Sequence, residues 1–260
     1  MTSPLDSFSN AAKSYASHAE IQLRVARDLV SICPPSAEFH SAIDLGCGTG
    51  FVSSLLLAQR PSLSLDCLDV APGMLAELES TLLRQGHSPR RLICSDARSY
   101  CGAYYDLVIS SSALHWMEPI AETVRSWSKL CATGGKLGIS CMVRGTLREL
   151  HEIRREEVPL VPPQRELPES QVLHDVINEA GFEMIQFMDR EYRLELPDPN
   201  HLYRMLTRSG TAGGQVSRGV RSLNVAELRR IARRYSERYS NDAGSIFATY
   251  RVAFAVAHAR

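Results

Sequence analysis

The sequence predicts an α/β fold: a doubly wound, mostly parallel sheet of seven strands, with an N-terminal helix and a helical insertion before the last strand. Short apolar runs alternate along the chain with longer segments of helical periodicity, a pattern that indicates a sheet between helical layers. A turn with glycine at every second position, Gly46 to Gly50, follows the first apolar run, and the second run ends at an acid, Asp69. In a doubly wound sheet both features lie at the carboxyl edge, where ligands bind.

Before residue 143, proline and glycine residues mark the ends of several expected elements. A helical pattern over residues 10–32 stops before Pro34-Pro35, and Gly134-Gly135 marks the turn into the fifth strand. The elements expected in between are strands at 42–45, 64–69, 91–94, 105–110 and 136–142, and helices at 51–59, 72–84 and 119–131. This alternation gives most strands a helical crossover and therefore a parallel neighbour.

After residue 142 the pattern changes. The expected elements are helices at 147–157, 169–180, 199–208 and 224–239, and strands at 183–194 and 246–257. Prolines 159, 162, 163 and 168 indicate a loop over residues 158–168. We therefore expect one domain over residues 1–260, with a helical cap at 1–35 and a helical lid at 198–240 between the last two strands.

Composition and charge favour a soluble enzyme. The chain has 29 lysine and arginine residues against 29 acidic ones, so no overall field attracts it to nucleic acid or to a membrane. It has no basic segment followed by a short apolar one at its start, and no apolar run of 18 residues. The seven cysteines form no C-x-x-C pair, which is typical of thiols in a reducing compartment. We expect a cytoplasmic, monomeric protein with no bound metal.

The spacing of the glycine turn distinguishes between nucleotide ligands. The turn reads D-x-G-x-G-x-G, with Asp44 two residues before Gly46, whereas a dinucleotide fingerprint reads G-x-G-x-x-G. A carboxylate beside the turn disfavours a pyrophosphate and suits a ligand with a positive end, and Asp69 can accept hydrogen bonds from ribose hydroxyls. This combination resembles the cofactor site of the class I S-adenosylmethionine-dependent methyltransferases.

That resemblance implies S-adenosyl-L-methionine as the cofactor and methyl donor. Asp96 would accept from the adenine amino group, the backbone of Ala97 would read a ring nitrogen, and Met74 would either cover the adenine or pack on the sheet. The carbonyls at the end of the fourth strand would face the amino-acid end of the cofactor, and the polar loop that follows would face the acceptor. The residues expected to bind the cofactor are Asp44, Gly46, Cys47, Gly48, Gly50, Asp69, Val70, Met74, Asp96, Ala97, Ser110, Ser111, Tyr15 and Gln22.

Five further segments resemble a single family. Residues 8–22 look like the opening of the malonyl-acyl-carrier-protein O-methyltransferases of biotin biosynthesis. Residues 113–116, Ala-Leu-His-Trp, are similar to that family's loop after the fourth strand, and residues 142–151 to its stretch after the fifth. Residues 204–211 resemble its lid helix and the glycine turn that ends it, and the aromatic strand 247–256 extends the resemblance over nearly the whole chain.

The resemblance implies transfer of a methyl group to the free carboxylate of malonyl carried on acyl carrier protein. A carboxylate is already a nucleophile at neutral pH, so it needs a cation and a water-excluded position rather than a general base. An arginine fork suits a carboxylate, and Arg204 on the lid helix is the first candidate, with Arg144 the second. Tyr15 is expected to close over both ligands, Trp116 to form an apolar wall, and His115 to donate to the acceptor.

Two other functions stay open. A methyltransferase of the same fold that acts on a small acid, such as aconitate, or on a quinone precursor would share the cofactor site and differ in the lid. A non-catalytic module that binds the cofactor would be expected to lose the glycine turn or the ribose acid, and this chain keeps both.

The segment from Arg218 to Arg238 contains seven arginines. On a helix, one basic face would be formed by the side chains of Arg229, Arg230, Arg233, Arg234 and Arg238. Such a face suits the docking of an acidic carrier protein, or it is a solvated face balanced by nearby glutamates.

Overall fold

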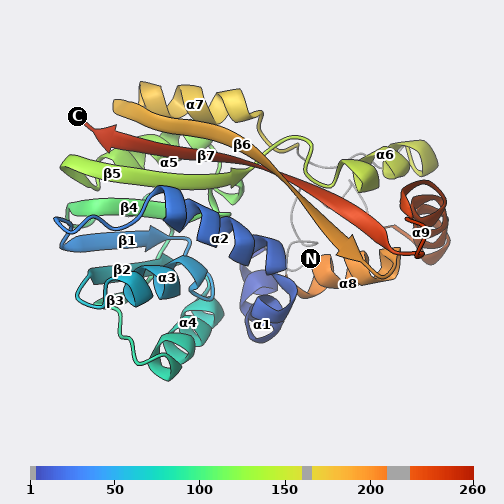
Figure 1. Ribbon diagram of the computed structural model, residues 1–260, viewed down its shortest axis with the longest axis horizontal. Coiled ribbons are helices and arrows are strands. Elements are labelled where there is room, and N and C mark those ends of the chain that lie inside the picture. The colour runs from blue at the N-terminus through green and yellow to red at the C-terminus, as the bar shows by residue number, and fades with distance from the viewer. Residues whose placement is uncertain (1–3, 160–165, 210–222) are drawn as a thin grey trace.

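The computed structural model describes residues 4–159, 166–209 and 223–260, and it contains the expected sheet (Figure 1). The strands are β1 (Ser41–Leu45), β2 (Ser64–Asp69), β3 (Arg91–Cys94), β4 (Tyr105–Ser111), β5 (Cys131–Met142), β6 (Phe182–Leu196) and β7 (Ile246–Ala259). Their order in the sheet is β3-β2-β1-β4-β5-β7-β6. Strand β7 is antiparallel to β5 and β6, and the other pairs are parallel, so the predicted fold class is confirmed.

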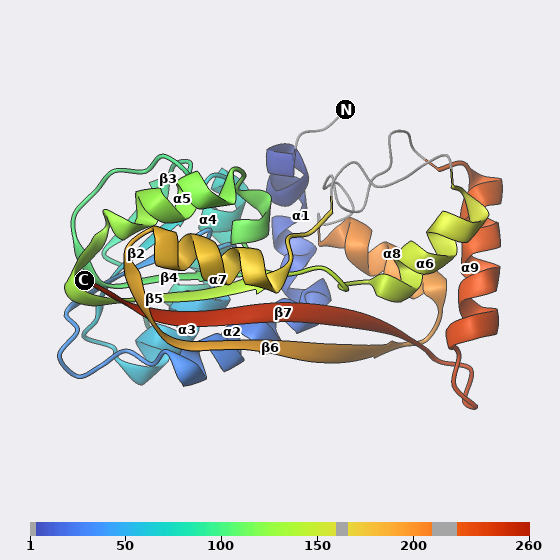
Figure 2. The same ribbon diagram turned by 90° about the horizontal axis from the view of Figure 1, so that it is seen from above.

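Helices cover both faces of the sheet. They are α1 (Pro4–His18), α2 (Glu20–Ile32), α3 (Phe51–Gln59), α4 (Pro72–Arg84), α5 (Ile120–Ser128), α6 (Arg148–Glu157), α7 (Ser170–Glu179), α8 (Pro199–Arg208) and α9 (Val225–Tyr239). Helices α2 and α3 lie on one face, and α5 and α7 lie on the opposite face (Figure 2). Strand β4 is accordingly buried on both sides, with Leu107 and Ile109 in one apolar cluster and Val108 in the other.

The described helices include none that is both long and apolar enough to cross a lipid bilayer.

The single helix expected at residues 10–32 is wrong, because the structure has two helices with a break at Ala19 (φ −110°, ψ 40°). Helix α2 packs on the sheet through Val25, Leu29 and neighbouring apolar residues. Helix α1 instead contacts α4 and α8, beyond the edge of the sheet. The break therefore lets the N-terminal segment turn from the sheet towards the helices that follow β2 and β6 (Figure 1).

The carboxyl ends of β1 and β4 form the point where the topology changes direction. From β1 the chain proceeds to β2 and β3 on one side, whereas β4 and β5 lie on the other side. A crevice at such a point is where doubly wound sheets bind ligands. The glycine turn after β1 lies here, as does the loop that follows Ser111 at the end of β4.

Strands β6 and β7 extend far beyond the rest of the sheet. Strand β5 pairs with β7 only between Lys136–His258 and Met142–Val252, whereas β6 stays paired with β7 as far as Leu196–Ile246. The extension, hereafter the β6–β7 ribbon, carries α8 and α9 at its far end (Figures 1 and 2). Helix α9 packs against α6 and β7, and its start is fixed by a capping box between Asn224 and Glu227.

Candidate active site

A cavity lies at the carboxyl ends of β1, β2 and β4, and residues of α1, α2 and α8 line its other side. It brings together most of the residues predicted to form the site. The predicted residues that line it are Tyr15, Gln22, Asp44, Gly46, Cys47, Gly48, Asp69, Val70, Met74, Asp96, Ala97, Ser111, His115 and Trp116. The cavity lining does not include Gly50, Ser110, Arg144 or Arg204.

The glycine turn presents bare backbone to this cavity. The N–H groups of Gly46 and Cys47 donate to the carbonyl of Leu68 at 2.8 and 3.0 Å, which ties the turn to the end of β2. Gly48 has a φ of +53°, and a Cβ built on it would meet no atom within 4 Å. Because Gly48 also lines the cavity, the space beside it is available to a ligand.

Asp69 connects the end of β2 to the glycine turn. Its Oδ2 accepts from the N–H of Gly48 at 2.9 Å, and its Oδ1 accepts from the N–H of Ala71 at 2.8 Å. Burial raises the pKa of this carboxyl, and the backbone hydrogen bonds oppose that rise. Each carboxylate oxygen has a second lone-pair site, so Asp69 can still accept from two hydroxyls of a ligand.

Asp44 is a second carboxyl group in the cavity, and it is only 1% exposed. Ser53 Oγ donates to its Oδ2 at 2.7 Å. Burial raises the pKa of Asp44 to about 7, and the charge of Asp69 adds to the rise, whereas the bond from Ser53 lowers it. Asp44 is therefore poised to ionise fully when a cation arrives beside it.

At the β3 side of the cavity, Asp96 already has a partner. Its carboxylate accepts from Nε of Arg98 at 2.9–3.0 Å, so the adenine contact expected of Asp96 would use its remaining lone pairs. Ala97 is fixed because its carbonyl accepts from Nε1 of Trp127 at 2.9 Å. Met74 is buried against Ala12 and Ala71, so it packs on α1 while also lining the cavity.

At the β4–β5 side the cavity is largely apolar. The rings of Phe8 and Trp116 meet edge to face with centroids 5.3 Å apart. Where α3 begins, after the glycine turn, the rings of Tyr15 and Phe51 are 6.1 Å apart. Sequence reasoning assigned no site role to several other wall residues, among them Met142, Thr146, Leu147, Leu167, Met205, Leu206 and Tyr250. Among the described residues that line the cavity there is no lysine or arginine.

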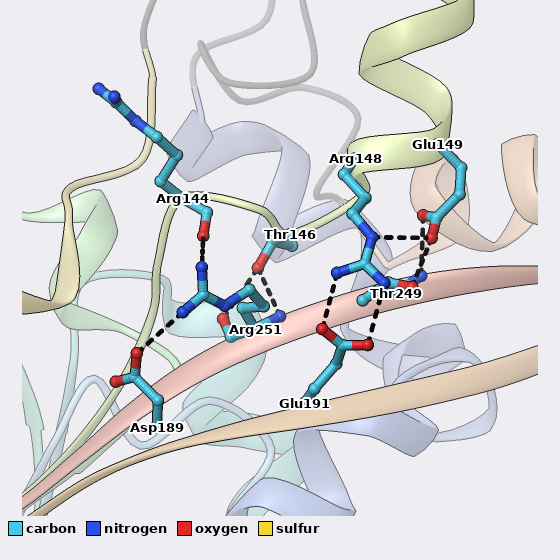
Figure 3. A network of polar contacts seen from close by, with 8 residues as sticks. All are labelled: Arg144, Thr146, Arg148, Glu149, Asp189, Glu191, Thr249 and Arg251. Carbon is cyan, nitrogen blue, oxygen red and sulfur yellow. Dashed lines mark hydrogen bonds and ion pairs between the residues drawn. The ribbon is translucent and has the colours of Figure 1, made fainter.

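The two arginines predicted to hold the acceptor carboxylate lie away from the described lining of the cavity. Arg204 is exposed, because α8 turns its next two residues, Met205 and Leu206, to the cavity. Arg144 extends away from the ribbon (Figure 3) and forms ion pairs with Glu166 at 3.0 Å and Glu169 at 2.7 Å. The structure brings neither guanidinium to the described cavity lining.

Two other predicted site residues have structural roles. Ser110 is buried and donates from its Oγ to the carbonyl of Leu45 at 2.7 Å, which joins β4 to β1. Gly50 is the residue before α3, with a φ of +91°, and a Cβ there would lie 2.9 Å from Cγ of Leu78. Both residues support the site from outside the cavity lining. Gly210 and Thr211, in the turn expected to end the lid helix, lie outside the described residues.

A polar network fixes the segment that supplies Thr146 and Leu147 to the cavity (Figure 3). Thr146 Oγ1 donates to the carbonyl of Arg251 at 2.9 Å and accepts from its N–H at 3.0 Å. Arg251 in turn donates to Asp189 at 3.0 Å. The resemblance over residues 142–151 indicated this segment, but its contribution to the cavity comes from Thr146 and Leu147 rather than from Arg144.

A family model described as "Methyltransferase domain" matches residues 43–137, the stretch that contains the glycine turn, Asp69 and Asp96. The chain is therefore an S-adenosylmethionine-dependent methyltransferase. The resemblance to malonyl-acyl-carrier-protein O-methyltransferases is also confirmed, since relatives with that name match from Acetivibrio thermocellus (27% identity, 95% of this chain and 90% of the relative) and Geobacter sulfurreducens (27%, 96% of each).

Solved structures agree on the fold of the methyltransferase. A putative methyltransferase from Bacillus halodurans superimposes with a TM-score of 0.65 at 13% identity, over 90% of this chain and 98% of that one. A Haemonchus contortus phosphoethanolamine N-methyltransferase, solved with S-adenosylhomocysteine, gives a TM-score of 0.55 at 16% identity, over 90% of this chain and 52% of that one.

The cavity of the methyltransferase fits S-adenosylmethionine. Gly48 offers backbone where a side chain would intrude, and Asp69 retains acceptor capacity for ribose hydroxyls. Thr49 is 4% exposed, and its Oγ1 has no hydrogen-bond partner among the described residues, as expected of a group that meets a polar ligand. Asp44 would lie with the positively charged end of the molecule.

The raised pKa of Asp44 predicts that cofactor affinity depends on pH. Below pH 7 the free enzyme holds Asp44 mostly protonated, and a ligand with an ammonium group prefers the ionised form. Affinity for S-adenosylhomocysteine should therefore increase by up to about tenfold between pH 6 and pH 8, with release of a proton on binding at the lower pH. Calorimetry in two buffers of different ionisation enthalpy measures both effects. Asp44→Asn should abolish them, and an unchanged slope in that variant would assign the proton to another group.

Proposed function

We propose that the enzyme transfers a methyl group to the free carboxylate of malonyl carried on acyl carrier protein. The supporting observation is the length of the match to the malonyl-acyl-carrier-protein O-methyltransferases. The domain match ends at residue 137, whereas these relatives align over 95% or more of the chain and so include the half that forms the acceptor side of the cavity.

The site has the properties that a carboxylate acceptor requires. S-adenosylmethionine supplies an electrophilic methyl group on a sulfonium. The chain's own residues hold the two reactants together and exclude water, through apolar walls that include Trp116, Leu147 and Met205. A carboxyl group with an ordinary pKa near 4 is ionised at neutral pH, so no residue has to remove a proton from it. Seven free cysteines are consistent with a reducing, cytoplasmic setting.

We also propose that, among the described residues of the segment 198–240, helix α8 forms the lid. Helix α8 supplies Met205, Leu206 and Ser209 to the cavity. Helix α9 lies beside α6, away from the described lining of the cavity. The lid is thus α8 together with α1, which it contacts through a bond from Ser14 Oγ to the carbonyl of Arg208 at 3.1 Å.

The basic face of α9 is less available for docking than the sequence suggested. Arg234 contacts Glu157 of α6 at 3.3 Å, and Arg238 contacts Glu156 at 2.8 Å. Arg230 and Arg233 also have acidic partners. Because α6 neutralises much of this face, its attraction for an acidic partner is reduced.

A different basic surface lies beside the cavity. Lys13 of α1 and Arg204 and Arg208 of α8 are exposed, and within the described part of the chain they form no ion pair. We call these three residues the α1–α8 rim. Their neighbours Tyr15, His18, Met205 and Ser209 line the cavity, so a carrier protein held at the rim would have its acyl arm at the opening.

The proposed function is tested with labelled S-adenosylmethionine and a panel of acceptors: malonyl-acyl carrier protein, malonyl-pantetheine, aconitate and a quinone precursor. Label transferred to the two malonyl thioesters alone, as a base-labile methyl ester, supports the proposal. Label on aconitate or on the quinone precursor instead would replace it with one of the alternatives.

The rim predicts a selective effect of charge reversal. Arg208→Glu combined with Lys13→Glu should lower kcat/KM for the malonyl carrier protein roughly tenfold, because electrostatic steering of the acidic partner is lost. Activity on malonyl-pantetheine should change little. Arg233→Glu combined with Arg234→Glu on α9 is the matched control, since it makes the same change in charge on a face that is already paired. Equal losses on both substrates, or a larger loss in the α9 variant, would contradict docking at the rim.

A further inference from the structure

Ser112, directly after β4, has a backbone conformation that serine rarely adopts. Its φ is +54°, in the left-handed region, and it shares this feature with only one other described residue that is not glycine, Leu147. Such a conformation costs free energy and persists where surrounding contacts enforce it, often at functional sites. Here the N–H of Ser112 donates to the carbonyl of Ser140 on β5 at 2.9 Å, which holds the turn in place.

The hydroxyl of Ser112 is buried, and it has no hydrogen-bond partner among the described residues. The neighbouring serines differ in this respect. Ser110 donates to the carbonyl of Leu45, and Ser140 donates to Oγ of Ser111 at 2.9 Å. A buried polar group without a partner is costly, so a strained turn that buries a free hydroxyl at a cavity indicates a ligand that completes it.

The position of Ser112 in the sheet indicates which ligand this is. The residues expected to hold the nucleoside follow β2 and β3, on one side of β1. Ser112 follows β4 and is bonded to β5, on the other side of β1, where the cavity walls include Met142, Thr146 and Leu147. Ser112 therefore lies at the acceptor side of the cavity.

We propose that the Ser112 hydroxyl binds the acceptor carboxylate, by donating a hydrogen bond to the oxygen that does not attack. This inference rests on the proposed function, because it needs an acceptor that is a carboxylate. The attacking oxygen forms the bond to the methyl carbon, the bond from that carbon to sulfur breaks, and its electron pair stays on sulfur. No proton moves, and the serine remains a neutral donor throughout.

A neutral donor suits this reaction. An arginine fork binds both oxygens of a carboxylate and draws charge from the one that must attack. A single hydroxyl orients the group and leaves the second oxygen free. This arrangement agrees with the absence of any lysine or arginine from the described lining of the cavity.

Two variants separate the hydroxyl from the backbone strain. Ser112→Ala and Ser112→Gly both remove the hydroxyl, but only glycine relieves the positive φ. Both should lower kcat/KM on malonyl thioester by about 10- to 100-fold, because a hydrogen bond to a charged group is lost. Both should bind S-adenosylhomocysteine like the wild type by calorimetry. Ser112→Gly should melt about 2–4 °C above Ser112→Ala, so that it is the more stable variant and still a poor enzyme.

Other results would contradict the role of Ser112 or the proposed function. Wild-type turnover in both variants, or in Ser112→Gly alone, would show that the hydroxyl does not bind the acceptor. A matching loss of S-adenosylhomocysteine affinity would move the residue to the cofactor end of the cavity and overturn the inference. A wild-type enzyme that methylates no carboxylate in the panel would remove the proposed function as well, whereas an active wild type with fully active variants would remove only the role of Ser112.

Discussion

Asp69→Ala should weaken S-adenosylhomocysteine binding by about 100-fold or more. Two hydrogen bonds from ribose hydroxyls to a charged group contribute about 1.5 kcal/mol each at the low end of the usual range. The variant also releases the N–H of Gly48, which Asp69 Oδ2 holds at 2.9 Å, so the glycine turn loses its anchor to β2. Calorimetry measures the affinity, and the ligand-induced rise in melting temperature provides an independent measurement.

The chain contains a matched control for this variant. Asp106 also accepts from two backbone N–H groups, those of His40 at 2.8 Å and Ser41 at 2.9 Å, and it does not line the cavity. Asp106→Ala should therefore destabilise the fold in a similar way while leaving the affinity for S-adenosylhomocysteine unchanged. A folded Asp69→Ala protein with wild-type affinity would show that the ribose is held elsewhere.

Gly48→Val should abolish cofactor binding in a protein that still folds. A Cβ at Gly48 would meet no protein atom within 4 Å and Gly48 lines the cavity, so the main cost to folding is the positive φ of +53°, roughly 1–3 kcal/mol. Gly86 has a similar φ of +75° and open space around it, but it is exposed and away from the cavity. Gly86→Val thus matches the strain without blocking the ligand.

The measurement is the melting temperature with and without S-adenosylhomocysteine. Both variants should melt below the wild type, but only Gly86→Val should keep the ligand-induced rise. A ligand-induced rise of normal size in Gly48→Val would mean that the cofactor does not approach the turn at this glycine.

The elements of the fold could be predicted because their signals are local. Strand β2 and helices α3, α4 and α8 begin and end at the predicted residues. Pro72 and Pro199 stand in the first turns of α4 and α8, where proline is favoured. The break at Ala19 carried no such signal, since no proline or glycine interrupts the helical pattern there. It arises because α2 packs on the sheet and α1 packs on α4 and α8, which depends on tertiary contacts.

The cofactor side of the site could be predicted for the same reason: glycine spacing and an acid at a strand end place backbone and carboxylate directly. The acceptor side could not. Whether Arg204 or Met205 faces the cavity depends on how α8 is rotated about its axis. Whether Arg234 is available to an acidic partner depends on Glu157, which lies on a different helix. The positive φ of Ser112 has no sequence signal, because serine occurs there without the glycine that would have indicated it.

The length of the β6–β7 ribbon determines the position of helix α8. Helix α8 is attached at its far end, so the number of paired residues beyond the last contact with β5 sets how far α8 stands from the glycine turn. Adding two residues to each strand would lengthen the reach by about 7 Å and keep every side chain on its own face, whereas adding one would reverse the faces. The size of the acceptor space can thus change in discrete steps during evolution while the cofactor half of the molecule stays the same.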